Sequence, residues 1–589
     1  METTQPFPQL LRRLWHHFPS RRRVQFGFLL TLTIVASFAE VLSIGAVLPF
    51  LAALTEPQRI FEHPLLQPLI KWLGFTTAEQ LLLPLTVIFG IAAIIAGAIR
   101  MLLLWASVRF SFKIGSELSV NVYRRTLYQS YATHISRNSS EVINVIWVKV
   151  SEVIFYIFMP GLTLISSVVM VVAIIIALFY VIPGVALALM GGFALLYALI
   201  IKMTRGRVRA DSQKIARESN NVIKNLQEGL GGIRDVLIDG SQESFCAIYQ
   251  QTNRVLRRAQ GNNQIISQGP RAGMEVLGTI MIATLAYILS RQPGGIGHAI
   301  PILAALALGL QRLLPALQQA YHSLSTIQGA QASLQDTLTL LDQDLPAYAG
   351  QQAATRMAFN DSIRLKRISF QYAAEAPWIL ENLDLVIQKG SRVGFIGGTG
   401  SGKSTLLDIV MGLLQPTLGS MEIDHQLIDQ VNCRSWQAHI AHVPQSVFLT
   451  DNSILENIAF GVEKSLINME LVIQAARQAQ IVDMIDSWPL KYQTAVGERG
   501  VQLSGGQRQR IGIARALYKQ ADVIIFDEAT SALDSETEEA VMQAIDALDG
   551  NITILIIAHR LNTLRKCNKI IKLGNRGIIS DNTSIKMNA

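Results

Sequence analysis

Long apolar runs alternate with polar stretches along the first 340 residues of the chain. A helix needs about 20 apolar residues to cross the roughly 30 Å hydrocarbon layer of a membrane. Six runs reach that length, at approximately 26–54, 81–106, 152–180, 183–203, 273–290 and 298–322. We therefore predict an all-α transmembrane domain of six helices over residues 1–340, with two polar loops, 107–151 and 202–271, outside the membrane.

The pattern of apolar positions changes after residue 340. Residues 341–356 are interpreted as a linker. From Met357 onward, short β-rich runs alternate with turn signals, which predicts an α/β domain over residues 357–589. The predicted architecture is a helical membrane domain followed by an α/β domain.

Charge divides the chain at the same point. Residues 1–340 contain 28 Lys and Arg against 16 Asp and Glu, whereas residues 341–589 contain 23 against 27. The basic excess therefore lies beside the apolar runs, which indicates a membrane surface as its partner and not nucleic acid. The three scattered cysteines exclude a disulfide framework and a cysteine metal site.

The distribution of basic residues predicts the orientation in the membrane. The loop 107–151 has six Lys and Arg and the loop 202–271 has twelve, but the alternate connections contain only Arg59, Lys71 and Arg291. Because basic loops stay on the cytoplasmic side, we expect both loops and both termini to be cytoplasmic in a multi-pass protein of the cell membrane.

A glycine-rich segment in the second domain predicts a phosphate site. An apolar strand over 393–396 is followed by Gly397-Gly398-Thr399-Gly400-Ser401-Gly402-Lys403-Ser404-Thr405. This matches G-x-x-x-x-G-K-[ST] between a strand and a helix. Backbone N–H groups and the helix N-terminus can surround a phosphate there. Lys403 is expected to reach the outer phosphates and Ser404 to ligate Mg²⁺, so ATP and Mg²⁺ are the expected cofactors.

A second apolar strand, over 523–526, ends in Asp527 and Glu528. Asp527 suits a role at the Mg²⁺ ion, and Glu528 can polarise the water that attacks the terminal phosphate. Together with the phosphate loop, these carboxylates predict an ATP hydrolase.

The segment Leu503-Ser504-Gly505-Gly506-Gln507 resembles the signature of the ATP-binding cassette (ABC) transporter family. The resemblance covers the whole chain and implies an exporter half-transporter. It implies that Tyr372 stacks on adenine, that Gln445 senses Mg²⁺, and that His559 contacts the γ-phosphate. Asp534 matches a further nucleotide-site loop of the family. Ser504, Gly505, Gly506 and Gln507 would close the nucleotide of a second copy, which implies a homodimer with two composite ATP sites.

Three arginines near the apolar runs are candidates for cargo binding. Arg312 lies inside the sixth run, Arg100 ends the second and Arg271 opens the fifth. Charges at such places are costly and often functional. Facing a cavity, they would suit a phosphate or pyrophosphate, which arginine binds with a planar fork. The alternative is that they reach the membrane interface or pair with Glu275.

The segments 38–50 and 311–315 (QRLLP) resemble lipid-linked oligosaccharide flippases of the PglK type. The resemblance implies a polyprenyl-pyrophosphate saccharide moved from the inner to the outer leaflet. Three alternatives remain: a lipid or hydrophobic-drug exporter, a peptide or protein exporter, and an ATP-gated channel.

Overall fold

The structure is a computed structural model. It describes residues 5–582 apart from 56–60, 62–66, 68–76, 78, 79, 81, 182, 291–294, 352, 353, 529–534, 547–549, 559–563, 565, 566 and 575. Contacts divide the chain into two compact units. The first consists of Met1–Gln129 and Ser136–Pro346, and the second of Ser130–Ile135 and Ala347–Ala589.

The first unit is helical. Its main helices are α1 (Phe7–His16), α2 (Ser20–Thr55), α5 (Leu82–Leu127), α7 (Ser139–Asn144), α8 (Val150–Val153), α9 (Met159–Val181), α10 (Pro183–Gly231), α11 (Ile233–Ile238), α12 (Gln242–Gln268), α13 (Pro270–Ser290), α14 (Gly295–Gly329) and α15 (Gln331–Leu341). Short π-helical turns, η2 (Val145–Lys149) and η3 (Ile154–Phe158), join α7, α8 and α9 into one continuous helical segment. Helix α6 (Tyr131–Ser136) begins in the short segment that packs with the second unit.

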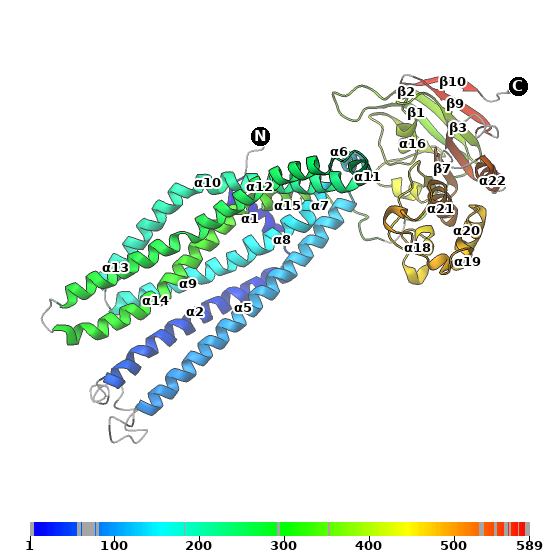
Figure 1. Cartoon of the computed structure of the whole chain (residues 1–589). Coiled ribbons are helices and arrows are strands. Elements are labelled where there is room, and N and C mark those ends of the chain that lie inside the picture. The colour runs from blue at the N-terminus through cyan, green and yellow to red at the C-terminus, as the bar shows by residue number, and fades with distance from the viewer. Residues whose placement is uncertain are drawn as a thin grey trace. The chain divides into compact units, whose positions relative to one another are not determined.

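The long helices run side by side in pairs, as Figure 1 shows for α2 with α5 and for α9 with α14. Among the described residues, three segments are long and apolar enough to cross a membrane, namely Ser20–Glu40, Leu82–Leu127 and Ser139–Ile176. Wherever the structure describes them, the residues of the six predicted spans are helical. The number that crosses the membrane stays a prediction.

The second unit contains two sheets. A four-stranded antiparallel sheet has the order β2-β1-β4-β5, and a six-stranded sheet has the order β10-β9-β3-β8-β7-β6, parallel except for β10. The strands are β1 (Ser362–Phe370), β2 (Leu380–Gln388), β3 (Arg392–Ile396), β4 (Leu418–Ile423), β5 (Gln426–Leu427), β6 (Ile440–Val443), β7 (Val523–Asp527), β8 (Thr553–Ile557), β9 (Lys569–Leu573) and β10 (Ile578–Asn582). The helices are α16 (Lys403–Val410), α17 (Cys433–Gln437), α18 (Ile454–Ile458), α19 (Met469–Gln478), α20 (Val482–Asp486), α21 (Gly505–Tyr518) and α22 (Ser535–Asp546).

The neighbouring strands β7 and β8 lie inside the parallel sheet and are apolar along almost their whole length. Residues 523–526 and all five residues of β8 are buried. Such continuous apolar strands are expected where helices cover both faces of a parallel sheet. The prediction of a helical membrane domain followed by an α/β domain is confirmed.

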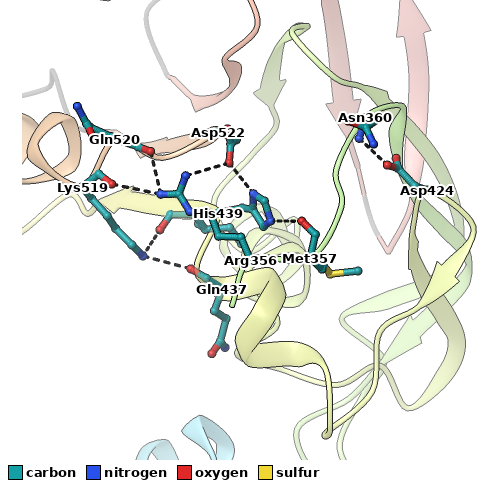
Figure 2. Close-up of polar contacts among 10 residues, drawn as sticks. Arg356, Met357, Asn360, Asp424, Gln437, His439, Lys519, Gln520 and Asp522 are labelled. Atoms are coloured by element: carbon teal, nitrogen blue, oxygen red, sulfur yellow. Dashed lines mark hydrogen bonds and ion pairs between the residues drawn. The ribbon is translucent and has the colours of Figure 1, made fainter. Parts of the chain in front are cut away.

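Polar contacts fix the segment that leads into the second unit. The Arg356 guanidinium donates to the backbone carbonyl of Gln520 at 2.9 Å and lies 3.5 Å from the Asp522 carboxylate (Figure 2). The ring of His439 lies between Asp522 and Met357, with Nδ1 2.5 Å from a carboxylate oxygen and Nε2 2.7 Å from the backbone carbonyl oxygen. These contacts join the entering segment to the β6–β7 edge of the parallel sheet.

Candidate functional site

The phosphate loop connects the buried strand β3 to helix α16. Gly400 and Gly402 have φ values of +79° and +89°, a left-handed conformation that favours glycine. At Gly402 a Cβ would come within 2.8 Å of the Leu380 side chain. The glycines therefore let the loop turn tightly onto the helix N-terminus.

Two polar side chains of this loop fit a bound phosphate. The Lys403 side chain is buried, and its Nζ donates to the carbonyls of Gly397 and Gly398 at 2.9 and 3.0 Å. The Ser401 hydroxyl is buried and has no hydrogen-bond partner among the described residues. Ser404 is exposed in the first helical turn. A buried ammonium, an unpartnered hydroxyl and a helix N-terminus together suit the phosphates of a nucleotide.

Tyr372 follows β1 and lies close to the start of α16. Its hydroxyl and the Thr405 hydroxyl are 3.1 Å apart, and its ring packs edge-on against Phe370 with 5.0 Å between centroids. Half of Tyr372 is exposed, at 51%. The structure thus brings a partly exposed aromatic ring to the phosphate loop.

The two predicted carboxylates lie at the end of strand β7, with Asp527 its last residue and Glu528 directly after it. Gln445 Nε2 donates to Glu528 Oε2 at 2.8 Å, so these two predicted residues are in direct contact. Glu528 has φ +51°, which is uncommon for a residue with a side chain. Strain of this kind is concentrated at functional sites. The backbone N–H of Glu528 donates to the Ile557 carbonyl at 3.1 Å, which holds the turn against β8.

Electrostatics link the strand end to the phosphate loop. Burial first, and then the charge of Glu528, raise the pKa of Asp527, while the Lys403 ammonium lowers it. Burial and the neighbouring Asp527 raise the pKa of Asp408 on α16 to about 6. Sequence reasoning did not single out Asp408, because it lies outside every motif and only the packing of α16 brings it to Asp527.

The signature residues lie at the start of another helix, α21. Ser504 is the N-cap, and its hydroxyl accepts from the backbone N–H of Gln507 at 3.2 Å. The Gln507 side chain accepts in return from the Ser504 N–H at 2.8 Å. This capping box satisfies two N–H groups that a helix start otherwise leaves open. Asp534 and His559 lie outside the described residues.

Two of the three candidate cargo arginines meet in one cavity of the helical unit. Arg100 on α5 and Arg312 on α14 line a cavity of about 410 Å³ together with Glu40 on α2. Glu40 Oε1 accepts from Arg100 Nη1 at 3.2 Å and from Arg312 Nη1 at 3.0 Å. Sequence reasoning missed Glu40 as the partner, although a carboxylate within an apolar run is itself a signal.

Arg271 lies in a different cavity, of about 560 Å³, lined also by Tyr197 and Glu275. Its Nε donates to Glu275 Oε1 at 3.0 Å, four residues along the same helix. This ion pair between Arg271 and Glu275 is the alternative to a cargo role that the sequence analysis gives for Arg271. The two cavities share Gln311, Pro315 and Gln319 as lining residues on α14.

The geometry defines a P-loop nucleotide-binding unit joined to a unit of long apolar helices. Comparison with known families agrees with both parts. The family model "ABC transporter transmembrane region" matches residues 26–294, and the family model "ABC transporter" matches residues 380–531. The chain belongs to the ABC transporter family and is a membrane protein. The predicted membership of the ABC transporter family is confirmed.

Two similar curated proteins are named as lipid flippases. An ATP-dependent lipid A-core flippase of Alkalilimnicola ehrlichii is 32% identical over 401 residues, which are 67% of this chain and 66% of the relative. An ATP-dependent lipid A-core flippase of Nitrosococcus oceani is 34% identical over 66% of this chain and 64% of the relative. The matched part of the chain thus spans just under two thirds of the length of both relatives.

A solved structure, that of a bacterial Atm1-family ABC exporter with ATP bound, has the same fold. It is 22% identical in sequence, with a TM-score of 0.77 over 96% of this chain and 95% of that chain. At this identity the likeness concerns the fold alone.

Proposed function

We propose that the chain is one half of an ATP-driven flippase that moves an anionic, saccharide-bearing lipid from the inner to the outer leaflet. The observation that carries this proposal is the convergence of Arg100 and Arg312 on one cavity among apolar helices. Arginine binds phosphate with several parallel hydrogen bonds. A cationic cavity beside apolar surface suits a lipid with a phosphate at the base of its headgroup.

The cargo has two candidate forms with the same chemistry. The sequence resemblance favours a polyprenyl-pyrophosphate oligosaccharide, and the curated relatives are named as lipid A-core flippases. Both are lipids that carry phosphate and sugar. A lipid or drug exporter without a cationic site remains the alternative, and in it substitution of the arginines would have little effect.

Different residues of the second unit are proposed to bind ATP, to hold Mg²⁺ and to activate the attacking water. Lys403 and the glycine loop are proposed to hold the phosphates, and Tyr372 to support the adenine. Glu528, held by Gln445, would accept a proton from the attacking water. Ser404, Gln445 and Asp527 are the proposed ligands of Mg²⁺, which supplies positive charge to the phosphates when bound. Because Mg²⁺ keeps several waters and phosphate ligands, few protein ligands are enough.

The working form is proposed to be a homodimer in the cell membrane, with both termini in the cytoplasm. Ser504, Gly505, Gly506 and Gln507 of one copy would close the ATP held by Lys403 of the other. Asp534 and His559 are proposed to complete that site. A single chain provides one phosphate loop and one signature, so two copies give two equivalent composite sites.

The test uses purified protein in liposomes with fluorescent lipid-linked oligosaccharide or lipid A-core glycolipid on the inner-leaflet side. Arg312→Ala should strongly reduce ATP-dependent flipping and leave basal ATPase activity close to wild type, because the ATP site belongs to the other unit. Arg312→Lys should restore part of the flipping, since it keeps the charge and loses the planar fork. Arg254→Ala, an exposed arginine on α12, is the matched control. Flipping at the wild-type rate by Arg312→Ala would refute the cationic site, and the two cargo lipids compared in parallel decide between the cargo forms.

A further inference from the structure

The carboxylate of Glu40 holds both cavity arginines through a single oxygen atom. Arg100 comes from α5 and Arg312 from α14, 60 and 272 residues away in sequence. Glu40 is the most enclosed of the three, with a side chain 15% exposed against 59% for Arg100 and 45% for Arg312. All three residues line the cavity, and the two guanidinium groups are more exposed than the carboxylate between them.

The cluster has a net charge of +1 when all three groups are ionised. Two arginines side by side repel each other, and an unpaired charge among apolar helices is expensive. Glu40 removes most of that cost. Each guanidinium has five N–H donors, of which the ion pairs with Glu40 use one, so donors remain for a further anion. A ligand that replaces Glu40 must compensate both arginines at least as well as a carboxylate does.

We propose that the Glu40 carboxylate competes with the lipid headgroup for Arg100 and Arg312. This competition makes the cavity selective for phosphomonoester or pyrophosphate groups over phosphodiesters. A phosphomonoester carries a charge of about −1.5 to −2 at pH 7, so it outcompetes the single charge of Glu40. A phosphodiester, the group of most bulk phospholipids, carries one charge and gains nothing over the carboxylate already present. Return of Glu40 to the arginines then favours release of the cargo.

This inference rests on the proposed function, because it assigns selectivity to the same cavity. It explains how a transporter surrounded by phospholipid could avoid occupation by the bulk lipid. The selectivity comes from the cost of displacing Glu40, which a weakly charged competitor does not offset, as well as from attraction of the cargo. Disfavouring the wrong ligand in this way is a general route to specificity.

The experiment measures binding before transport. Protein in phosphatidylcholine nanodiscs is titrated with fluorescent phosphatidic acid, a phosphomonoester, and with fluorescent phosphatidylglycerol, a phosphodiester. Wild-type protein should prefer phosphatidic acid by about tenfold or more, which corresponds to about 1.4 kcal/mol. Glu40→Gln keeps an oxygen for the arginines but loses the charge. It should bind both lipids more tightly and reduce the preference to about threefold or less. Glu40→Asp should keep the preference.

Glu275→Gln is the matched control, because Glu275 pairs with Arg271 in the neighbouring cavity and should not change the preference. A merely structural role of Glu40 would lower the unfolding temperature and weaken binding of both lipids equally, and that result overturns the proposal. An unchanged preference in Glu40→Gln also overturns it. If the preference shifts as expected but neither glycolipid is flipped with ATP, the proposed function fails and the selectivity of the cavity stands.

Discussion

Replacement of Glu528 by glutamine tests the chemistry at the strand end most directly. The variant side chain has the same shape, and its amide oxygen can still accept the hydrogen bond that Gln445 Nε2 donates at 2.8 Å. The backbone at φ +51° costs glutamine about as much as glutamate. The change therefore removes the proton acceptor and its charge while the contacts of the site remain.

The size of the effect follows from the role of a positioned base. General-base catalysis contributes roughly 10²- to 10⁴-fold, or about 2.7 to 5.4 kcal/mol at about 1.36 kcal/mol per decade. No separate loss of about 0.5–1.5 kcal/mol for a broken hydrogen bond is expected, because the bond to Gln445 is kept. Glu528→Gln should thus lower ATPase activity by about 100-fold to 10,000-fold and leave the unfolding temperature nearly unchanged.

The assay follows phosphate release by purified protein in nanodiscs, with binding of a fluorescent ATP analogue measured on the same samples. ATP binding should persist, and the proposed homodimer of the variant should stay closed on its nucleotide. Glu470→Gln, an exposed carboxylate in the first turn of α19, is the control and should hydrolyse ATP at the wild-type rate. ATPase activity of Glu528→Gln within about threefold of wild type would refute the role of Glu528 as the base.

Two further outcomes are expected in the second unit. Lys403→Ala removes the ammonium that lies against the Gly397 and Gly398 carbonyls, and the loss of a charged hydrogen bond of about 1.5–3 kcal/mol should raise the Kd for ATP roughly 10- to 100-fold in a fluorescence titration. An unchanged Kd would contradict this. Burial and Asp527 raise the pKa of Asp408 to about 6 from an ordinary 3.8, so the folded state favours the protonated carboxyl. The contribution of Asp408 to the free energy of unfolding is therefore fully present below pH 3.8 and is lost as the pH rises through 6. Between pH 5 and 7 the unfolding free energy of Asp408→Asn should therefore decline by about 1 kcal/mol less than that of wild type, allowing for partial exposure of the side chain. Identical profiles of unfolding free energy against pH for the variant and wild type would disprove the raised pKa of Asp408.

The local parts of the ATP site were predictable from the sequence. The phosphate loop needs glycines at Gly400 and Gly402 for its positive φ angles, and this requirement is visible as a motif. Asp527 and Glu528 follow an apolar strand directly, so their place at the end of a buried strand is also visible in the chain. Each of these relations spans only a few residues.

The long-range contacts were not predictable in the same way. Glu40 meets Arg312 because α2 and α14 pack against each other and against the same neighbour, α9. Asp408 approaches Asp527 only because α16 packs on the parallel sheet. An apolar face in a helix sequence indicates that the face is buried, but it does not indicate which other helix packs on it. Partner choice between distant charges is therefore set by packing and not by any local pattern.

The anchoring of Arg356 and His439 decides where the second unit can be separated from the rest of the chain. The family match begins at residue 380, but β1 precedes that residue and pairs with both β2 and β4. A truncation at residue 380 would leave these two strands without the one between them. A truncation after Met357 would keep the strand but lose the Arg356 contacts with Gln520 and Asp522. A recombinant fragment for crystallisation or nucleotide titration should start upstream of Arg356.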